Sequence, residues 1–292
     1  MKEARLMRNF DHPNVVKCYG VAAGQEPLMV VMELVNNGSL DSYLQKNELS
    51  PQQKMELCCG AAWGLEYIHS RNVIHRDIAA RNCLVGDGKV RISDFGLSHE
   101  GTSYQGDPKM KVPIRWLAPD TIRTMLYTTK SDVWAYGIMC WEIFANGTEP
   151  YPGMTVAETA VKVCRDGYRM PLPDGTPTEM YTIIVAKCWA DAPNDRASMG
   201  EISHLLERNT GLSRPYVPPP TPPAPCPNVT PVVTPLPQAA PPVPTPPPNF
   251  GIPMQNTGSH TETDHRNKKA KKGTASKNKG KSKCNNNGGY TM

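Results

Sequence analysis

A break in composition late in the chain constrains its fold more than any other feature of the sequence. Eighteen of the 30 prolines lie between Pro215 and Pro253. Proline at this density favours an extended polyproline helix and cannot build a packed core. We therefore expect one folded domain over residues 1–208, a disordered proline-rich linker over 211–254 and a disordered basic tail over 255–292.

The net charge of the chain comes from this tail. Residues 211–292 hold ten Lys/Arg and two Asp/Glu, a net of +8, whereas the remaining residues hold 22 basic and 25 acidic side chains, a net of −3. The overall charge of +5 therefore does not indicate a basic folded surface.

Cysteine usage and hydropathy indicate a reducing compartment. The nine cysteines are an odd number without CxxC spacing, which fits free thiols. The most apolar stretch, LMVVMELV, is interrupted by Glu33 and is too short to span a membrane, so we expect a buried strand there. The first ten residues lack the apolar core of a signal peptide. We expect a cytoplasmic protein with no transmembrane segment.

The apolar spacing predicts a small β region followed by helices. Residues 2–10 have helical spacing, and two β-rich runs at 15–21 and 28–35 predict a hairpin. Ser39 and Ser50 are expected to cap helices, the second with a proline in its first turn. Residues 98–120 predict a long mobile loop, and further helices are expected over 130–145, 155–166, 178–189 and 198–208.

Two short strings, HRDIAARN at 75–82 and DFG at 94–96, carry the candidate chemistry. Asp77 can accept the proton of an incoming hydroxyl, and Asn82 and Asp94 offer oxygen ligands to a hard cation. Each carboxylate alone is equally compatible with an ordinary turn residue. Both together, with Asn82 between them at this spacing, indicate a phosphoryl-transfer site.

These strings, with WLAPD at 116–120 and SDVWAYG at 131–137, resemble the motifs of protein kinases. The resemblance extends from Glu3 to about Leu206. It implies an α+β, protein-kinase-like fold, with a truncated small β lobe before a mainly helical lobe, and it implies ATP and Mg²⁺ as cofactors.

The same resemblance implies structural roles for four residues. Asp132 would hold the backbone of the catalytic loop. His75 and Phe95, with Met7, would form the buried column that joins the two lobes. For the apolar residues, plain core packing is an equally good and compatible interpretation.

The pattern around Arg81 resembles tyrosine kinases. Serine/threonine kinases usually place a Lys two residues after the catalytic Asp, where this chain has Ala79, and VPIRW at 112–116 resembles the tyrosine-kinase substrate loop. A phenol projects farther from its backbone than a serine hydroxyl, so an Arg reaching in would orient it. MELVNNGSL, HRDIAARNCLV and DFGLS look most like cytoplasmic Fer/Fes-type enzymes, which implies protein tyrosine substrates.

The resemblance also implies where the nucleotide base would lie. Met32 would guard the back pocket, the backbone of Glu33 and Val35 would bond the adenine edge, and Leu84 would form the floor. An ordinary buried strand and a core leucine explain these residues equally well.

Tyr104, in the expected mobile loop, occupies the position that tyrosine kinases autophosphorylate. A phosphate adds about −1.5 to −2 charges and can order a loop against an arginine, here Arg76. The alternative is an exposed tyrosine without a role.

The phosphate-binding half of the kinase pattern is not found before Glu3. Kinases hold the phosphates with a Gly-rich loop and a strand Lys, which pairs with the Glu that Glu3 represents. Without those strands, residues 15–35 would present an unpaired sheet edge. We expect poor ATP binding and poor folding at the N-terminus, and an incomplete gene sequence or natural truncation would explain Met1.

Asp120 replaces the Glu of the usual APE motif. That Glu normally pairs with an Arg near the end of the domain, here Arg196. Because Asp is one methylene shorter, we expect a stretched pair or a small backbone shift.

The tail suggests binding partners. PPPTPPAP and PPVPTPPP contain PxxP spacings, which favour docking to SH3 or WW domains, although a flexible spacer fits as well. The basic run at 266–283 suggests contact with anionic lipid or nucleic acid, or a nuclear import signal, and a solvated tail is the alternative.

Two functions remain open at this stage. The first is a non-receptor protein tyrosine kinase, which the intact catalytic motifs favour. The second is a catalytically inactive, kinase-like scaffold or interaction protein, which the missing phosphate loop favours.

Overall fold

The computed structural model of the chain describes residues 2–22 and 29–217. The predicted linker and tail beyond residue 217 lie outside the described residues. The α-helices are α1 (Lys2–Met7), α2 (Leu40–Lys46), α3 (Pro51–Ser70), α4 (Pro119–Thr124), α5 (Thr129–Phe144), α6 (Val156–Arg165), α7 (Thr178–Tyr181) and α8 (Met199–Thr210).

The strands form four antiparallel pairs, each of two strands: β1 (Cys18–Ala22) with β2 (Met29–Met32), β3 (Val73–Ile74) with β6 (His99–Glu100), β4 (Cys83–Gly86) with β5 (Lys89–Ile92), and β7 (Ser103–Gln105) with β8 (Leu126–Thr128). Short helical turns are η1 (Ala80–Asn82), η2 (Ile114–Trp116), the π-helix η3 (Thr182–Cys188) and η4 (Pro193–Asp195).

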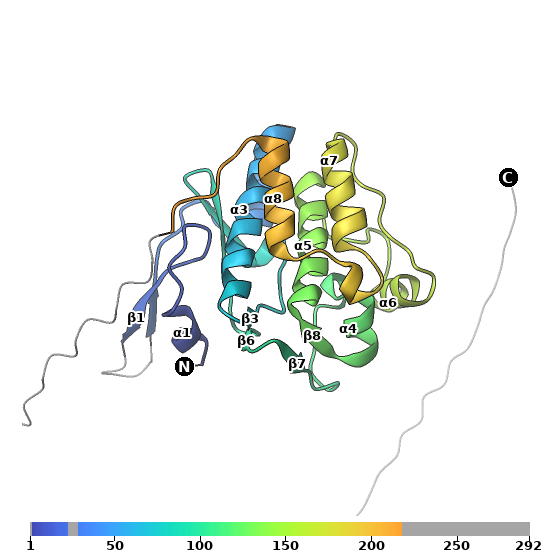
Figure 1. Cartoon of the computed structure of the whole chain (residues 1–292), viewed down its shortest axis with the longest axis horizontal. Helices are drawn as coiled ribbons and strands as arrows, with labels where there is room; N and C mark the ends of the chain where they lie inside the picture. Colours follow the sequence, from blue (N-terminus) through green and yellow to red (C-terminus); the bar gives the residue numbers. More distant parts are fainter. Residues whose placement is uncertain (1, 23–28, 218–292) are drawn as a thin grey trace, which may run out of the picture. The chain divides into compact units, whose positions relative to one another are not determined.

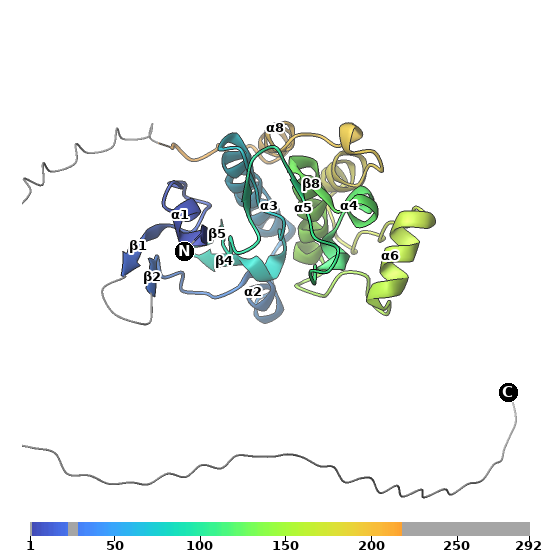
Figure 2. The same ribbon diagram turned by 90° about the horizontal axis from the view of Figure 1, so that it is seen from below.

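In the described residues, a small β region lies at one end of a helical body. Figure 1 shows β1 and α1 on one side and the packed helices α3, α5 and α8 beside them. Figure 2, seen from below, shows β1, β2 and α1 again apart from α4 and α6. The predicted α+β, kinase-like arrangement of a small β region before helices is confirmed.

The predicted hairpin is confirmed, but its second strand is not buried. Val21 pairs with Val30 in the ladder. The four residues of β2 are 40–57% exposed, and Leu34 is 88% exposed. The prediction of a buried strand in LMVVMELV was wrong, because among the described residues β2 pairs only with β1 and its side chains stay exposed.

Helix α3 begins where Ser50 and Pro51 predicted. The Ser50 hydroxyl accepts the backbone N–H of Gln53, whose side chain accepts that of Ser50, so both ends of a capping box are present. Ser39 likewise precedes α2, although its hydroxyl donates to Ser42 and not to the helix backbone. Gly64 lets α3 approach the segment between α1 and β1, since a Cβ there would lie 2.5 Å from the Asn14 carbonyl oxygen.

The central helix α5 is buried along nearly its whole length. Trp134 and Tyr136 are fully buried, and the Tyr136 hydroxyl donates to the Cys58 carbonyl on α3 at 2.9 Å. The helices predicted over 130–145, 155–166, 178–189 and 198–208 are all present, the third of them as α7 continued by the π-helix η3.

The segment expected to be a mobile loop contains regular structure. Strands β6 and β7 lie within it, and they pair with β3, which precedes the catalytic loop, and with β8, which precedes α5. The polar composition of residues 98–120 suggested a loop. It did not reveal these strands, because β3 and β8, with which they pair, lie outside the segment. No helix in the described residues is both long and apolar enough to cross a membrane.

Candidate active site

A buried carboxylate on α5 holds the backbone before Asp77. Asp132, which is 1% exposed, accepts the backbone N–H groups of His75 and Arg76, each at 2.8 Å. The His69 ring nitrogen Nε2 lies 3.0 Å from the same carboxylate. Arg76 has a φ of 73°, a left-handed conformation that these hydrogen bonds stabilise.

His75 links the catalytic loop to the segment before Asp94. Burial lowers the pKa of His75, so the ring is neutral near pH 7. Its Nε2–H donates to the Ser93 carbonyl at 3.1 Å, because a carbonyl can only accept, and Nδ1 accepts the Asp77 backbone N–H at 3.3 Å. The neutral His75 ring is therefore hydrogen-bonded both to the catalytic loop at Asp77 and to the segment that precedes Asp94.

Asp77, Arg81 and Asn82 form one hydrogen-bonded group. The Arg81 guanidinium donates to the Asp77 carboxylate at 2.5 Å. The Asn82 amide nitrogen donates to the Asp77 carbonyl at 2.8 Å, and the Asn82 carbonyl accepts the Ser93 N–H at 2.9 Å and its hydroxyl at 2.7 Å. These contacts bring Asp77 and Asn82 next to the start of the DFG segment.

Asp94 and Asn82 fit a magnesium ion in the number and kind of their oxygen atoms. The exposed Asp94 has a φ of 57°, and its Oδ1 accepts the Gly96 N–H at 3.2 Å. The side-chain nitrogen of Asn82 already donates to the Asp77 carbonyl, so the side-chain oxygen is the atom that is available to a cation. Mg²⁺ takes one or two protein oxygens together with phosphate oxygens and water. Among the described residues no three His, Cys, Asp or Glu side chains gather as a metal site.

Phe95 lies in the core between the helical body and α1. It is 1% exposed, and its ring centre lies 5.0 Å from that of His75 and 5.1 Å from that of Phe10. Met7 is also 1% exposed and belongs to the same core cluster.

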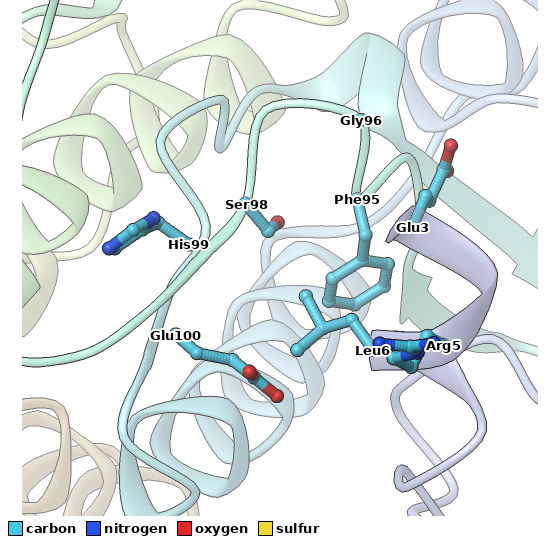
Figure 3. Close-up of a pocket in the computed structure, with 8 residues that line it drawn as sticks. All are labelled: Glu3, Arg5, Leu6, Phe95, Gly96, Ser98, His99 and Glu100. Atoms are coloured by element: carbon cyan, nitrogen blue, oxygen red, sulfur yellow. The ribbon is translucent and has the colours of Figure 1, made fainter. Parts of the chain in front are cut away.

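A cavity of about 250 Å³ separates α1 from the DFG segment. Figure 3 shows Glu3, Arg5 and Leu6 on α1 across from Phe95, Gly96, Ser98, His99 and Glu100. A Cβ placed on Gly96 would lie 3.2 Å from the Asp94 Oδ1 and 4.0 Å from the Glu3 Oε2. The Asp94 and Glu3 carboxylates therefore both approach Gly96.

The residues predicted to surround the nucleotide base are only partly brought together. Val35 and Leu84 are half-buried and pack against the main core. Glu33 donates its N–H to the Lys17 carbonyl at 2.9 Å, and its carboxylate pairs with Arg91 at 3.0 Å. Met32, by contrast, lies on the exposed strand β2 with 48% of its surface accessible.

Tyr104 lies against Arg76 and not in open solvent. Its ring centre is 3.9 Å from the Arg76 guanidinium, and Tyr127, its partner in the β7–β8 ladder, is 4.5 Å from the same group. The Arg76 Nη1 donates to the Leu97 carbonyl at 2.7 Å. The loop around Tyr104 is thus packed on the catalytic loop.

The shorter acid Asp120 still reaches its partner. It forms an ion pair with Arg196, which is 1% exposed. The Arg196 guanidinium also donates to the carbonyls of Ala190 at 2.9 Å and Lys130 at 3.1 Å. The described backbone therefore accommodates the loss of one methylene.

Comparison with known proteins agrees with this geometry. The family model of the protein tyrosine and serine/threonine kinases matches residues 1–206. The chain belongs to this kinase family. Fer-related kinase 1 of Caenorhabditis elegans is 45% identical over 207 residues, which cover 70% of this chain and 53% of the relative.

Two other relatives are tyrosine kinases by name. Tyrosine-protein kinase Fer of Mus musculus is 41% identical over 211 residues, covering 70% of this chain and 25% of the relative. Tyrosine protein-kinase src-1 of Caenorhabditis elegans is 38% identical over 231 residues, covering 76% and 43%. The kinase domain of this chain is therefore Fer-like, and the chain spans between a quarter and about half of these relatives.

The sequence interpretation missed one residue beside the candidate site, Glu142. Glu142 on α5 is 4% exposed and accepts hydrogen bonds from the Ala80 backbone at 3.0 Å and from the Trp116 indole at 2.9 Å. The Arg81 guanidinium lies 4.1 Å from the centre of the Trp116 ring. A single carboxylate inside the apolar run AYGIMCWEIF was the available signal.

Proposed function

We propose that this chain is the catalytic part of a non-receptor tyrosine kinase, which transfers the γ-phosphate of ATP to tyrosine hydroxyls of proteins. The observation that carries the proposal is the placement of Arg81. Its guanidinium forms an ion pair with Asp77 and stacks over the Trp116 ring of the VPIRW loop. The position two residues after Asp77, where serine/threonine kinases usually have Lys, is Ala79.

In this proposal Asp77 accepts the proton of the substrate phenol. Its carboxylate is 15% exposed, and the loop that carries it is held by Asp132 before it and by Asn82 after it. Arg81 orients the phenol from the side. Positioning of this kind supplies most of the catalysis that phosphoryl transfer needs from a protein.

Asn82 and Asp94 are the proposed ligands of Mg²⁺. When bound, the ion neutralises charge that develops on the transferred phosphoryl group. Glu3 belongs to the proposed nucleotide side, where kinases pair this Glu with a phosphate-binding Lys. Met32, Glu33, Val35 and Leu84 are the proposed surroundings of the adenine.

The remaining proposals concern regulation and location. Tyr104 is the proposed autophosphorylation site, with Arg76 as the partner of its phosphate. We propose a kinase domain over residues 1–208 in a cytoplasmic protein. SH3 or WW domains for the proline-rich segment, and anionic lipid or nucleic acid for the basic one, are proposed partners of a part outside the described residues.

A transfer assay with a matched substitution tests this function. The purified chain is incubated with Mg²⁺, radiolabelled ATP and either a tyrosine peptide or the same peptide with serine in its place. We expect label on the tyrosine peptide alone, at a rate limited by the poor ATP binding expected of this chain, and a loss of at least about 100-fold in Asp77→Asn, since general bases contribute about 10²–10⁴-fold. Equal label from Asp77→Asn, or label on serine alone, would refute the proposal, and no label from the wild-type chain would favour the scaffold.

A further inference from the structure

The catalytic loop is attached to α5 at both of its ends by buried carboxylates. Asp132 accepts the N–H groups that precede Asp77, and Glu142 accepts the N–H of Ala80, which follows it. The two acids are ten residues apart on one helix, roughly 15 Å along its axis. The sequence motifs account for Asp132 but assign nothing to Glu142.

Glu142 also reaches a second loop. Its Oε2 accepts both the Ala80 N–H and the Trp116 indole N–H, so one oxygen atom joins the catalytic loop to the VPIRW loop. A carboxylate that is 4% exposed is costly to bury, and two donors on one oxygen offset part of that cost.

Trp116, which Glu142 holds in place, in turn contacts Arg81. The indole face lies 4.1 Å from the guanidinium, which itself donates to Asp77. The Arg81 Nη1 is buried and has no hydrogen-bond partner among the residues that the structure describes.

We propose that Glu142 is a positioning residue for the tyrosine substrate. By holding Ala80 and Trp116 with one carboxylate, it sets the place of Arg81 beside Asp77, and so the affinity for the substrate side chain. This inference rests on the proposed tyrosine kinase function. Glu142 touches neither substrate nor the reacting atoms.

The surroundings of Glu142 shift its pKa. Burial raises the pKa of Glu142 to about 7, against the hydrogen bonds from Trp116 and Ala80 and the charge of Arg81, which lower it. Asp41 of α2 raises it further, and the Cys83 thiol of β4 also faces it. The carboxylate therefore gains its charge, and bonds the indole N–H more strongly, as the pH rises through about 7.

Two variants separate the contacts. Trp116→Phe keeps an aromatic ring under Arg81 and removes the indole donor, whereas Glu142→Gln keeps volume and an acceptor but removes the charge. The matched control is Trp63→Phe, because the Trp63 indole on α3 donates to Glu207 on α8 at 2.9 Å, a hydrogen bond that involves neither the catalytic loop nor the VPIRW loop.

Steady-state kinetics give the first measurement. We expect Trp116→Phe to raise the KM for a tyrosine peptide by about 3- to 10-fold, the size of one hydrogen bond, and to leave the KM for ATP unchanged. Trp63→Phe should change neither. An unchanged peptide KM in Trp116→Phe would overturn the proposal.

The second measurement needs no turnover. In ¹⁵N spectra of the whole chain, the Trp116 indole signal is identified by its absence in Trp116→Phe. We expect it to shift with a midpoint near pH 7 in the wild type and to lose this midpoint in Glu142→Gln. A wild-type signal without that midpoint would also overturn the proposal.

The two proposals fail in different ways. If the wild-type chain transfers no phosphate, the proposed function fails, and peptide affinity measured by fluorescence anisotropy replaces KM. The positioning role then stands only if Trp116→Phe weakens peptide binding by about threefold or more, while Trp63→Phe does not.

Discussion

The guanidinium of Arg76 lies 3.9 Å from the centre of the Tyr104 ring. Arg76 is also bonded through its backbone to Asp132, so the stack connects the loop of Tyr104 to the base of the catalytic loop. Its Nε is buried without a hydrogen-bond partner among the described residues. A phosphate on Tyr104 would exchange a cation–π contact, worth about 0.5–2 kcal/mol, for a charge-assisted pair with this group.

Tyr104→Phe tests this exchange. Because phenylalanine keeps the ring over Arg76, we expect the free energy of unfolding to change by no more than about 0.5 kcal/mol. Wild-type protein preincubated with Mg-ATP should gain activity and carry phosphate at Tyr104 by mass spectrometry, whereas the variant should gain nothing. An equal gain in the variant would rule out Tyr104 as the regulatory site.

Asp120→Ala should destabilise the protein, because it leaves the buried Arg196 without its carboxylate. Breaking a buried ion pair costs about 3–5 kcal/mol, and the backbone carbonyls that Arg196 retains put the expected loss at the lower end. Asp120→Glu is the matched control and should cost less than about 1.5 kcal/mol. Chemical denaturation of the three proteins measures both values, and equal losses in the two variants would contradict the ion pair as the cause.

Asp132→Asn should lower both stability and activity. An amide can accept at only one of its two ends, so at least one of the N–H groups of His75 and Arg76 is left buried without a partner, at a cost of about 1–3 kcal/mol. The exposed Asp174 supplies a control, since Asp174→Asn removes the same charge outside these contacts. Thermal unfolding of both variants checks the prediction. Similar melting temperatures would show that Asp132 does not hold the loop.

The charge on Glu142 predicts a pH-dependent difference in stability. Its pKa in the folded protein, about 7, is higher than its ordinary value of 4.5, so the folded state binds more protons between these values. The stability contributed by protonated Glu142 is therefore present below about pH 4.5 and is lost as the pH rises through about 7. Relative to Glu142→Gln, the wild type should lose up to about 3 kcal/mol over this window.

Paired denaturation curves at pH 5 and pH 8 measure this loss. The comparison with Glu142→Gln is needed because buried His12 and His75 act in the opposite direction. Burial lowers the pKa of His12 to about 4 and also lowers that of His75, so their contributions are present above about pH 6.5 and are lost in acid. A stability difference between the two proteins that does not vary with pH would refute the raised pKa of Glu142.

Local patterns in the sequence were sufficient for most of the helical body. Ser50 and Pro51 marked the start of α3, and the apolar spacing of residues 130–145 marked α5, because capping and helical periodicity act over a few neighbouring residues. The spacing of Asp77, Asn82 and Asp94 indicated phosphoryl transfer for a similar reason, since two short loops carry all three.

Contacts between distant segments depend on packing that no local pattern records. Asp132 lies 57 residues from His75, and Glu142 lies 62 residues from Ala80, yet each carboxylate holds that loop. The exposure of β2 is the converse case, because an apolar strand is buried only if another layer covers it. The sequence by itself thus determined which side chains can perform the chemistry. Only the tertiary structure decided which carboxylates hold the catalytic loop and which strands are buried, because burial and hydrogen bonding depend on neighbours far along the chain.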